Sequence, residues 1–68
     1  MKSVTFQVFI PEREVASLLD MLRYDAATVV SWDRAKDLRD RHGWLVTLRS
    51  DRYTPDRWAS FGLYPKEV

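Results

Sequence analysis

The sequence predicts a small two-layer α+β domain, in which two helices cover one face of a three-stranded, mainly antiparallel sheet. Three observations lead to this prediction: an alternating apolar pattern near the N-terminus, an apolar stripe with helical spacing after it, and two further short strand patterns before a second helix start. The chain has 68 residues, which is the size of a single domain. Such a domain buries only about 60% of the surface that its unfolded chain exposes, so we expect a small margin of stability.

The first strand and the first helix have the clearest patterns. Residues 3–10 alternate, and the side that is fully apolar consists of Val4, Phe6, Val8 and Ile10. Residues 11–24 are predicted to form a helix, because Pro11 suits a first helical position and the next apolar residues are spaced at i, i+3, i+4 and i+7. These residues are Val15, Leu18, Leu19 and Leu22. We expect this stripe to pack on the apolar side of the strand.

Two short strands are predicted in the middle of the chain, over residues 27–32 and 44–49. The charged segment 33–42 between them has two interpretations. It is either the arm of a long hairpin or an additional short helix, which Ser31 would cap and Gly43 would end. The apolar stripe of such a helix would be narrow, which favours the hairpin.

The C-terminal part contains a helix start at Thr54-Pro55-Asp56, where a hydroxyl cap precedes a proline and an acid. We predict a short helix over 55–61, with a fourth strand over 57–64 as the alternative, and a loose tail over 65–68. The resulting order of strand, helix, strand, strand and helix resembles a truncated ferredoxin-like unit that lacks its last strand.

The composition argues against several classes of function. The chain has no cysteine and one histidine, which excludes a disulfide framework, a thiolate metal site and a multi-histidine metal centre. No apolar run is long enough for a membrane span and no signal-peptide pattern is present, so we expect a cytoplasmic protein without a membrane partner. His42 has no nucleophile motif beside it, and two glycines do not make a phosphate-binding loop. We therefore expect neither catalysis nor a cofactor nor a metal site.

The aromatic residues favour protein binding. There are nine of them, more than so small a core accommodates, and we expect Phe6, Trp44, Trp58 and Phe61 to be the buried ones. Phe9, Tyr24, Tyr53 and Tyr64 are then partly exposed, and Trp32 stays undecided. Because aromatic and arginine side chains are enriched in interfaces, we expect a small non-catalytic module whose partner is a protein.

The predicted partner-binding residues come from the uncovered sheet face, from the charged arm and from the loop before the second helix. They are Gln7, Phe9, Leu45, Thr47, Arg49, Arg34, Arg39, Arg41 and Tyr53. One alternative is a nucleic-acid-binding regulator that uses the same face to stack bases. A second is a structural subunit that forms homodimers through this face or a strand edge. Small proteins of this size are common among phage and mobile-element products, so an inhibitor of a host complex, such as an anti-CRISPR protein, fits the expected class.

Overall fold

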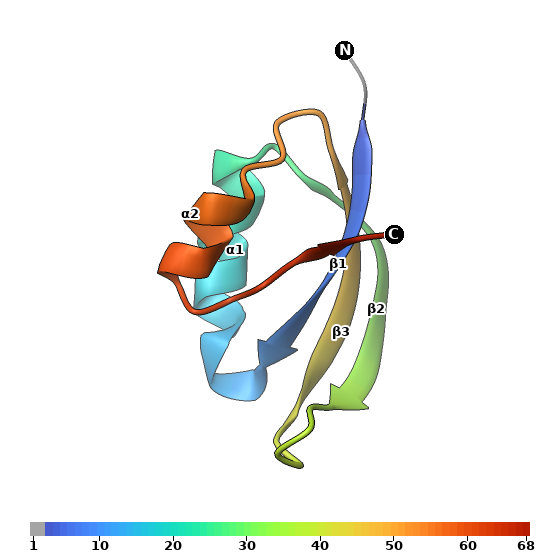
Figure 1. Cartoon of the computed structure of the whole chain (residues 1–68), viewed down its shortest axis with the longest axis vertical. Coiled ribbons are helices and arrows are strands. Elements are labelled where there is room, and N and C mark those ends of the chain that lie inside the picture. The colour runs from blue at the N-terminus through green and yellow to red at the C-terminus, as the bar shows by residue number, and fades with distance from the viewer. Residues whose placement is uncertain (1–2) are drawn as a thin grey trace.

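A small antiparallel sheet with both helices on one of its faces forms the domain (Figure 1). The computed structural model describes residues 3–68. The elements are β1 (Val4–Pro11), the 3₁₀ turn η1 (Glu12–Glu14), α1 (Val15–Tyr24), β2 (Thr28–Lys36), β3 (His42–Ser50), α2 (Pro55–Ser60) and β4 (Lys66–Glu67). The predicted α+β class is therefore confirmed, and so is the first strand.

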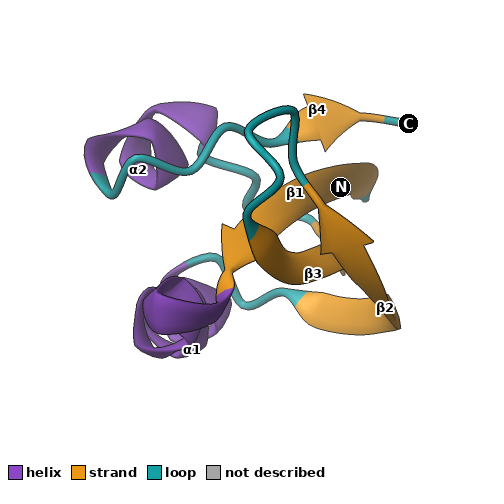
Figure 2. Cartoon of the chain, turned by 90° about the horizontal axis from the view of Figure 1, so that it is seen from below, coloured by secondary structure: helices purple, strands orange, loops and turns teal. Residues whose placement is uncertain are grey.

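The sheet has four strands in the order β2-β3-β1-β4, one more than predicted. The short strand β4 pairs with Phe6 and Gln7 of β1, and the Val68 N–H donates to the Thr5 carbonyl at 3.0 Å. The prediction of a loose tail was wrong, and the missing last strand is present at the edge of the sheet (Figure 2). Two paired residues are too few to produce an alternating pattern. The alternative strand over 57–64 is also wrong, because Pro55–Ser60 is helical.

The first helix begins later than predicted. Pro11 is the last residue of β1, with φ −58° and ψ 149°, and α1 starts only at Val15 after the η1 turn. The ring of proline fixes φ at a value that both a helix start and an extended strand accept. Pairing of Pro11 with Gly43 in β3 holds it in the extended conformation.

The charged segment forms a hairpin, and the alternative short helix over 33–42 is wrong. Strand pairing continues through the charged residues, from Asp33 opposite Leu45 to Lys36 opposite His42, so only residues 37–41 form the turn. The Asp37 carboxylate closes this turn by accepting the backbone N–H groups of Arg39 and Arg41, each at 2.9 Å. Both strands are longer than predicted. Their pairing with each other continues through residues whose polar side chains do not by themselves indicate a strand. Gly43 lies within β3 and ends no helix.

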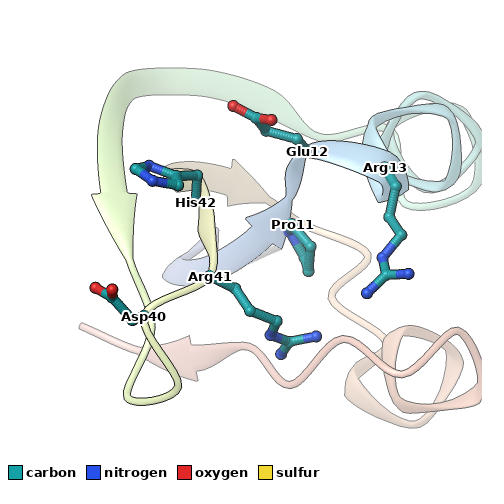
Figure 3. Close-up of a pocket in the computed structure, with 6 residues that line it drawn as sticks. All are labelled: Pro11, Glu12, Arg13, Asp40, Arg41 and His42. Carbon is teal, nitrogen blue, oxygen red and sulfur yellow. The ribbon is translucent and has the colours of Figure 1, made fainter.

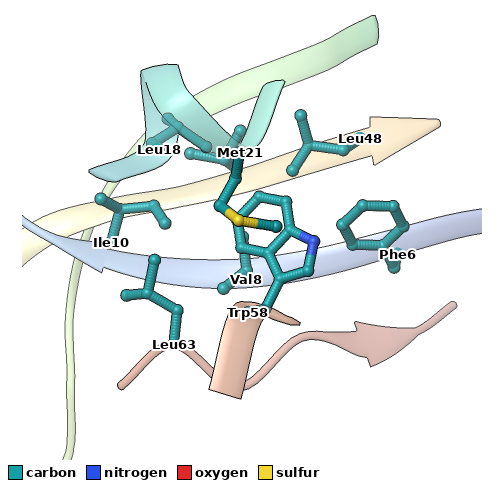
Figure 4. Close-up of a cluster of buried hydrophobic side chains, with 9 residues drawn as sticks. Phe6, Val8, Ile10, Leu18, Met21, Leu48, Trp58 and Leu63 are labelled. Carbon is teal, nitrogen blue, oxygen red and sulfur yellow. The ribbon is translucent and has the colours of Figure 1, made fainter. Parts of the chain in front are cut away.

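The core lies between the sheet and the helices (Figure 4). Its buried apolar residues are Phe6, Val8, Ile10, Leu18, Met21, Val46, Leu48, Trp58 and Leu63. Burial of Phe6 and Trp58 was predicted correctly, but Trp44 is only partly buried and Phe61 is 39% exposed. Leu63 is buried instead, after Gly62 has ended α2 with φ +77°.

The helix stripe is rotated relative to the prediction. Leu18 and Met21 are buried, whereas Leu19 is 56% exposed. Neighbouring helical residues point about 100° apart. With Leu18 at the centre of the buried face, Leu19 therefore points to the flank and Met21 lies closer to the core.

A single buried carboxylate connects the helix layer. Asp25, directly after α1, accepts hydrogen bonds from Trp58 Nε1 at 2.8 Å, from the Thr54 N–H at 3.3 Å and from the Thr54 hydroxyl. Its own carbonyl accepts a bond from Ser50 Oγ at 2.5 Å. The Thr54 hydroxyl donates to Asp25 and makes no capping hydrogen bond to the N–H groups of α2, so the predicted cap is absent.

Replacing Leu18 tests the observed helix rotation. We expect Leu18→Ala to lower the free energy of unfolding by about 2–5 kcal/mol, because it leaves a cavity in the core. Leu19→Ala is the matched control and should change stability by less than about 0.5 kcal/mol, as exposed positions usually do. Urea unfolding measures both values. Equal losses would contradict the rotation.

Removing the Asp25 carboxylate should destabilise the domain by about 1–3 kcal/mol, because the Trp58 indole N–H then has no acceptor in the core. Urea unfolding of Asp25→Ala, of Trp58→Phe and of the double variant forms a double-mutant cycle. We expect Trp58→Phe to cost less in the Asp25→Ala background, where the N–H is already unsatisfied. Strictly additive losses would show that this hydrogen bond does not couple the two residues.

Candidate functional site

The outer edge of β2 is the longest backbone edge that the sheet leaves open. β2 stands at one end of the strand order, and within residues 3–68 only β3 pairs with it. β4 covers part of the opposite edge of the sheet by pairing with β1. Alternate residues along the nine-residue strand β2 thus present backbone N–H and C=O groups to the outside, which is a template for another strand.

Exposed apolar side chains accompany this edge. Val29 is 40%, Val30 50% and Trp32 38% exposed, and Val30 lies at an irregularity in the pairing with β3. Val29 and Trp32 lie opposite the core residues Leu48 and Val46 and therefore share their face, the one that carries the helices. The helix layer leaves this part of the sheet only partly covered.

Trp32, Arg34 and Trp44 form a cluster on the same face, which we call the β2 aromatic cluster. The Trp32 and Trp44 ring centroids are 5.4 Å apart, and the Arg34 guanidinium carbon lies 4.7 Å from the Trp44 centroid. Glu12 holds Arg34 from the other side at 3.2 Å. Cross-strand contacts of this kind stabilise the hairpin, and they also fix a partly exposed tryptophan in place.

The open sheet face brings five predicted residues together. Gln7 lies opposite Thr47 and donates to its hydroxyl at 3.1 Å, and Phe9 lies opposite Leu45, while Arg49 is exposed near one end. All of them except Arg49 are partly buried.

Phe9 also has a structural role on that face. A Cβ added to Gly43 would lie 2.6 Å from Cζ of Phe9, so the ring lies directly over the glycine. An aromatic ring diagonal to a glycine covers backbone that has no side chain of its own. Part of the apolar surface that the sequence suggested for binding is therefore already used within the domain.

The remaining predicted residues do not join this face. Arg34 belongs to the β2 aromatic cluster, and Arg39 and Arg41 are on the hairpin turn. Tyr53 stacks on Phe6 with centroids 4.4 Å apart, at the margin of the core. Burial, with the negative charges of Glu67 and Asp25 in addition, raises the pKa of the Tyr53 hydroxyl above its ordinary value.

The turn itself is a network of ion pairs. Arg41 Nε donates to Asp37 Oδ2 at 2.6 Å, and Lys36 pairs with Asp40 at 3.3 Å. The aspartates of the turn are thus paired with cations, and the part of the chain that the structure describes contains no group of three residues placed to hold a metal ion.

Two shallow hollows lie beside Pro11 and share Arg13 and Arg41, and Figure 3 shows the residues that line the first of them. The first, of about 330 Å³, also includes His42, which is exposed. The second, of about 240 Å³, also includes Glu14, Phe61 and Leu63. Arg13 was not predicted as a site residue, because an arginine inside a predicted helix resembles any solvated surface charge.

The hydrogen bonds of Asp37 in the hairpin turn are expected to make stability depend on pH. The hydrogen bond from the Arg41 backbone N–H holds the pKa of Asp37 below its ordinary value of 3.8, against an opposing loss of hydration and with further help from the Arg41 side chain and the Arg39 N–H. The stabilisation that these hydrogen bonds give to the folded state is thus present at pH values above the ordinary pKa. It is lost as the pH falls through the lower pKa that Asp37 has in the folded state.

Substitutions of the two arginines of the turn separate the side-chain and backbone contributions to the pKa of Asp37. Arg41→Gln should raise the pKa of Asp37 only part of the way, because the backbone donor remains, whereas Arg39→Gln should leave it unchanged. ¹³C NMR titration of the Asp37 carboxyl carbon measures the shift. An unchanged midpoint in Arg41→Gln would show that the backbone donors alone set the value.

No helix within residues 3–68 has the length and apolar character needed to cross a membrane. Comparison with known proteins adds no assignment: no protein-family model, no curated protein and no solved structure matches the chain. The function therefore has to be inferred from the side chains and backbone edges of this domain.

Proposed function

We propose that the domain is a non-catalytic protein-binding module that pairs its β2 edge with an extended strand of a partner protein. The observation that carries this proposal is the nine-residue outer edge of β2, which no strand within residues 3–68 covers. In strand addition, backbone hydrogen bonds supply affinity and alternate side chains supply specificity.

The side chains beside the edge support this choice. Val29 and Trp32 offer apolar surface on the helix-bearing face, where inward-pointing side chains of an added strand would lie. Trp32 is held by Trp44, so it loses little side-chain freedom when it is covered. Tryptophan and arginine are also the residues that most often dominate the energy of an interface.

The β2 edge is a better candidate than the open sheet face. On that face Phe9 covers Gly43, and Gln7 and Thr47 are bonded to each other, so fewer groups are free for a partner. Arg49 and Lys66, which lies opposite Gln7, are exposed cations of this face within residues 3–68, and two cations are few for a nucleic-acid surface, where several phosphate contacts are needed. We keep nucleic-acid binding and homodimer formation as outcomes that the experiment separates.

Val30→Lys tests the proposal at the exposed edge. A lysine there blunts the edge without removing a buried side chain, and Leu38→Lys at the exposed hairpin turn is a matched control. A partner captured from the source cells with the wild-type chain is purified, and its affinity for the three proteins is measured. We expect Val30→Lys to weaken binding by about tenfold or more, which corresponds to about 1.4 kcal/mol, and Leu38→Lys to leave it unchanged.

Hydrogen–deuterium exchange of the complex locates the interface. Protection of the β2 amides supports strand addition. Protection confined to the open face, or equal affinity of Val30→Lys and the wild type, contradicts it. A partner that is a nucleic acid, with affinity that falls steeply with salt, would favour the regulator, and concentration-dependent sedimentation that Val30→Lys abolishes would identify the partner strand as a second copy of this chain.

A further inference from the structure

Arg41 presents a free guanidinium end beside the hairpin turn. Its Nε is bonded to Asp37 Oδ2, and its backbone N–H is bonded to Asp37 Oδ1, so the residue is held at both ends. Within residues 3–68 the two terminal nitrogens of Arg41 have no further acceptor. A guanidinium held in this way keeps the two parallel N–H donors that bind a carboxylate or phosphate in forked geometry.

Arg13 brings a second cation to the same place. It lies in η1, and no carboxylate of the described chain lies within ion-pair distance of it. Arg13 and Arg41 extend to the same side of Pro11 (Figure 3), and both line the hollow of about 240 Å³. Two positive groups beside one hollow repel each other, and an anion between them removes that repulsion.

The walls of this hollow are suited to a side chain with an apolar stem. Pro11, Phe61 and Leu63 line it together with the two arginines. Pro11, Phe61 and Leu63 offer contact to methylene groups, which a glutamate side chain has and a free phosphate lacks.

The charges nearby favour a monoanion. Glu14 also lines the hollow, with its carboxylate bonded to the Ser17 hydroxyl at 3.2 Å, and Asp37 stands behind Arg41. Two arginines and two carboxylates sum to zero, so a dianionic phosphate would meet more repulsion than a single carboxylate. We propose that the Arg13–Arg41 hollow binds the carboxylate of a glutamate side chain from an acidic segment of a partner protein.

This inference rests on the proposed function and specifies the partner further. Arg41 belongs to the turn that follows β2, but the other residues of the hollow lie at the end of β1, in η1 and after α2, and β3 separates β1 from β2. A partner strand added to β2 would therefore reach the hollow only with an acidic segment that continues past the hairpin turn.

A small probe tests the hollow independently of strand addition. The folded chain is titrated with N-acetyl-glutamate amide at constant ionic strength, and ¹H–¹⁵N NMR follows the Nε–H groups of Arg13 and Arg41 and the Gly62 amide. N-acetyl-glutamine amide is the neutral control, and inorganic phosphate is the competing anion. We expect saturable shifts with the glutamate probe, weaker binding of phosphate and no shifts with the glutamine control, and about tenfold weaker binding of the glutamate probe in Arg13→Gln, as for loss of a charged hydrogen bond.

Arg23→Gln, an exposed arginine of α1, is the matched control and should leave the affinity unchanged. Shifts that do not saturate, tighter binding of phosphate than of the glutamate probe, or equal affinities of Arg13→Gln and Arg23→Gln would each overturn the proposal. Retained amide spectra of both variants establish that they are folded. The probe cannot form a strand. A lack of probe binding is therefore a separate result from a lack of effect of Val30→Lys on the affinity for the partner.

Discussion

The buried residue Asp25 holds three separate parts of the chain in one arrangement through its carboxylate and its backbone carbonyl. It lies where α1 ends and, through Thr54 and Trp58, it fixes the start of α2, while its carbonyl is bonded to Ser50 at the end of β3. α2 has only six residues and could not hold its position by helix formation alone. The placement of Trp58 over Phe6, with ring centroids 5.6 Å apart, therefore depends on a polar contact as well as on apolar packing.

The order of strands then decides which surface is available. With β1 and β3 at the centre of the sheet, their apolar sides form the core and their other sides form the open face. β4 protects part of one edge, and β2 is left at the other with Trp32 beside it. The proposed binding surface is thus a direct consequence of topology, because an antiparallel sheet that does not close always leaves two edges.

Charged residues have different roles according to the strand or turn that carries them. In β2 Arg34 lies on Trp44 and pairs with Glu12, which makes it part of the packing. In the turn Asp37 orients Arg41, which leaves the guanidinium end free beside Arg13. The same residue type, arginine, therefore has a packing role in one position and a proposed recognition role in the other.

The sequence by itself determined the α+β class, the first strand and the short second helix, because these depend on local patterns: strict alternation from Val4 to Ile10 and the Thr54-Pro55-Asp56 helix start. It did not determine that Pro11 ends a strand, that residues 33–36 and 42–43 pair, or that Lys66 and Glu67 complete the sheet. Each of these features is set by hydrogen bonds to a strand far away in the chain. Burial of Met21 and Leu63 in place of Leu19 and Phe61, and the meeting of Arg13 with Arg41, were likewise decided only by tertiary packing, because the rotation of a helix and the neighbours of a loop depend on the surface they pack against.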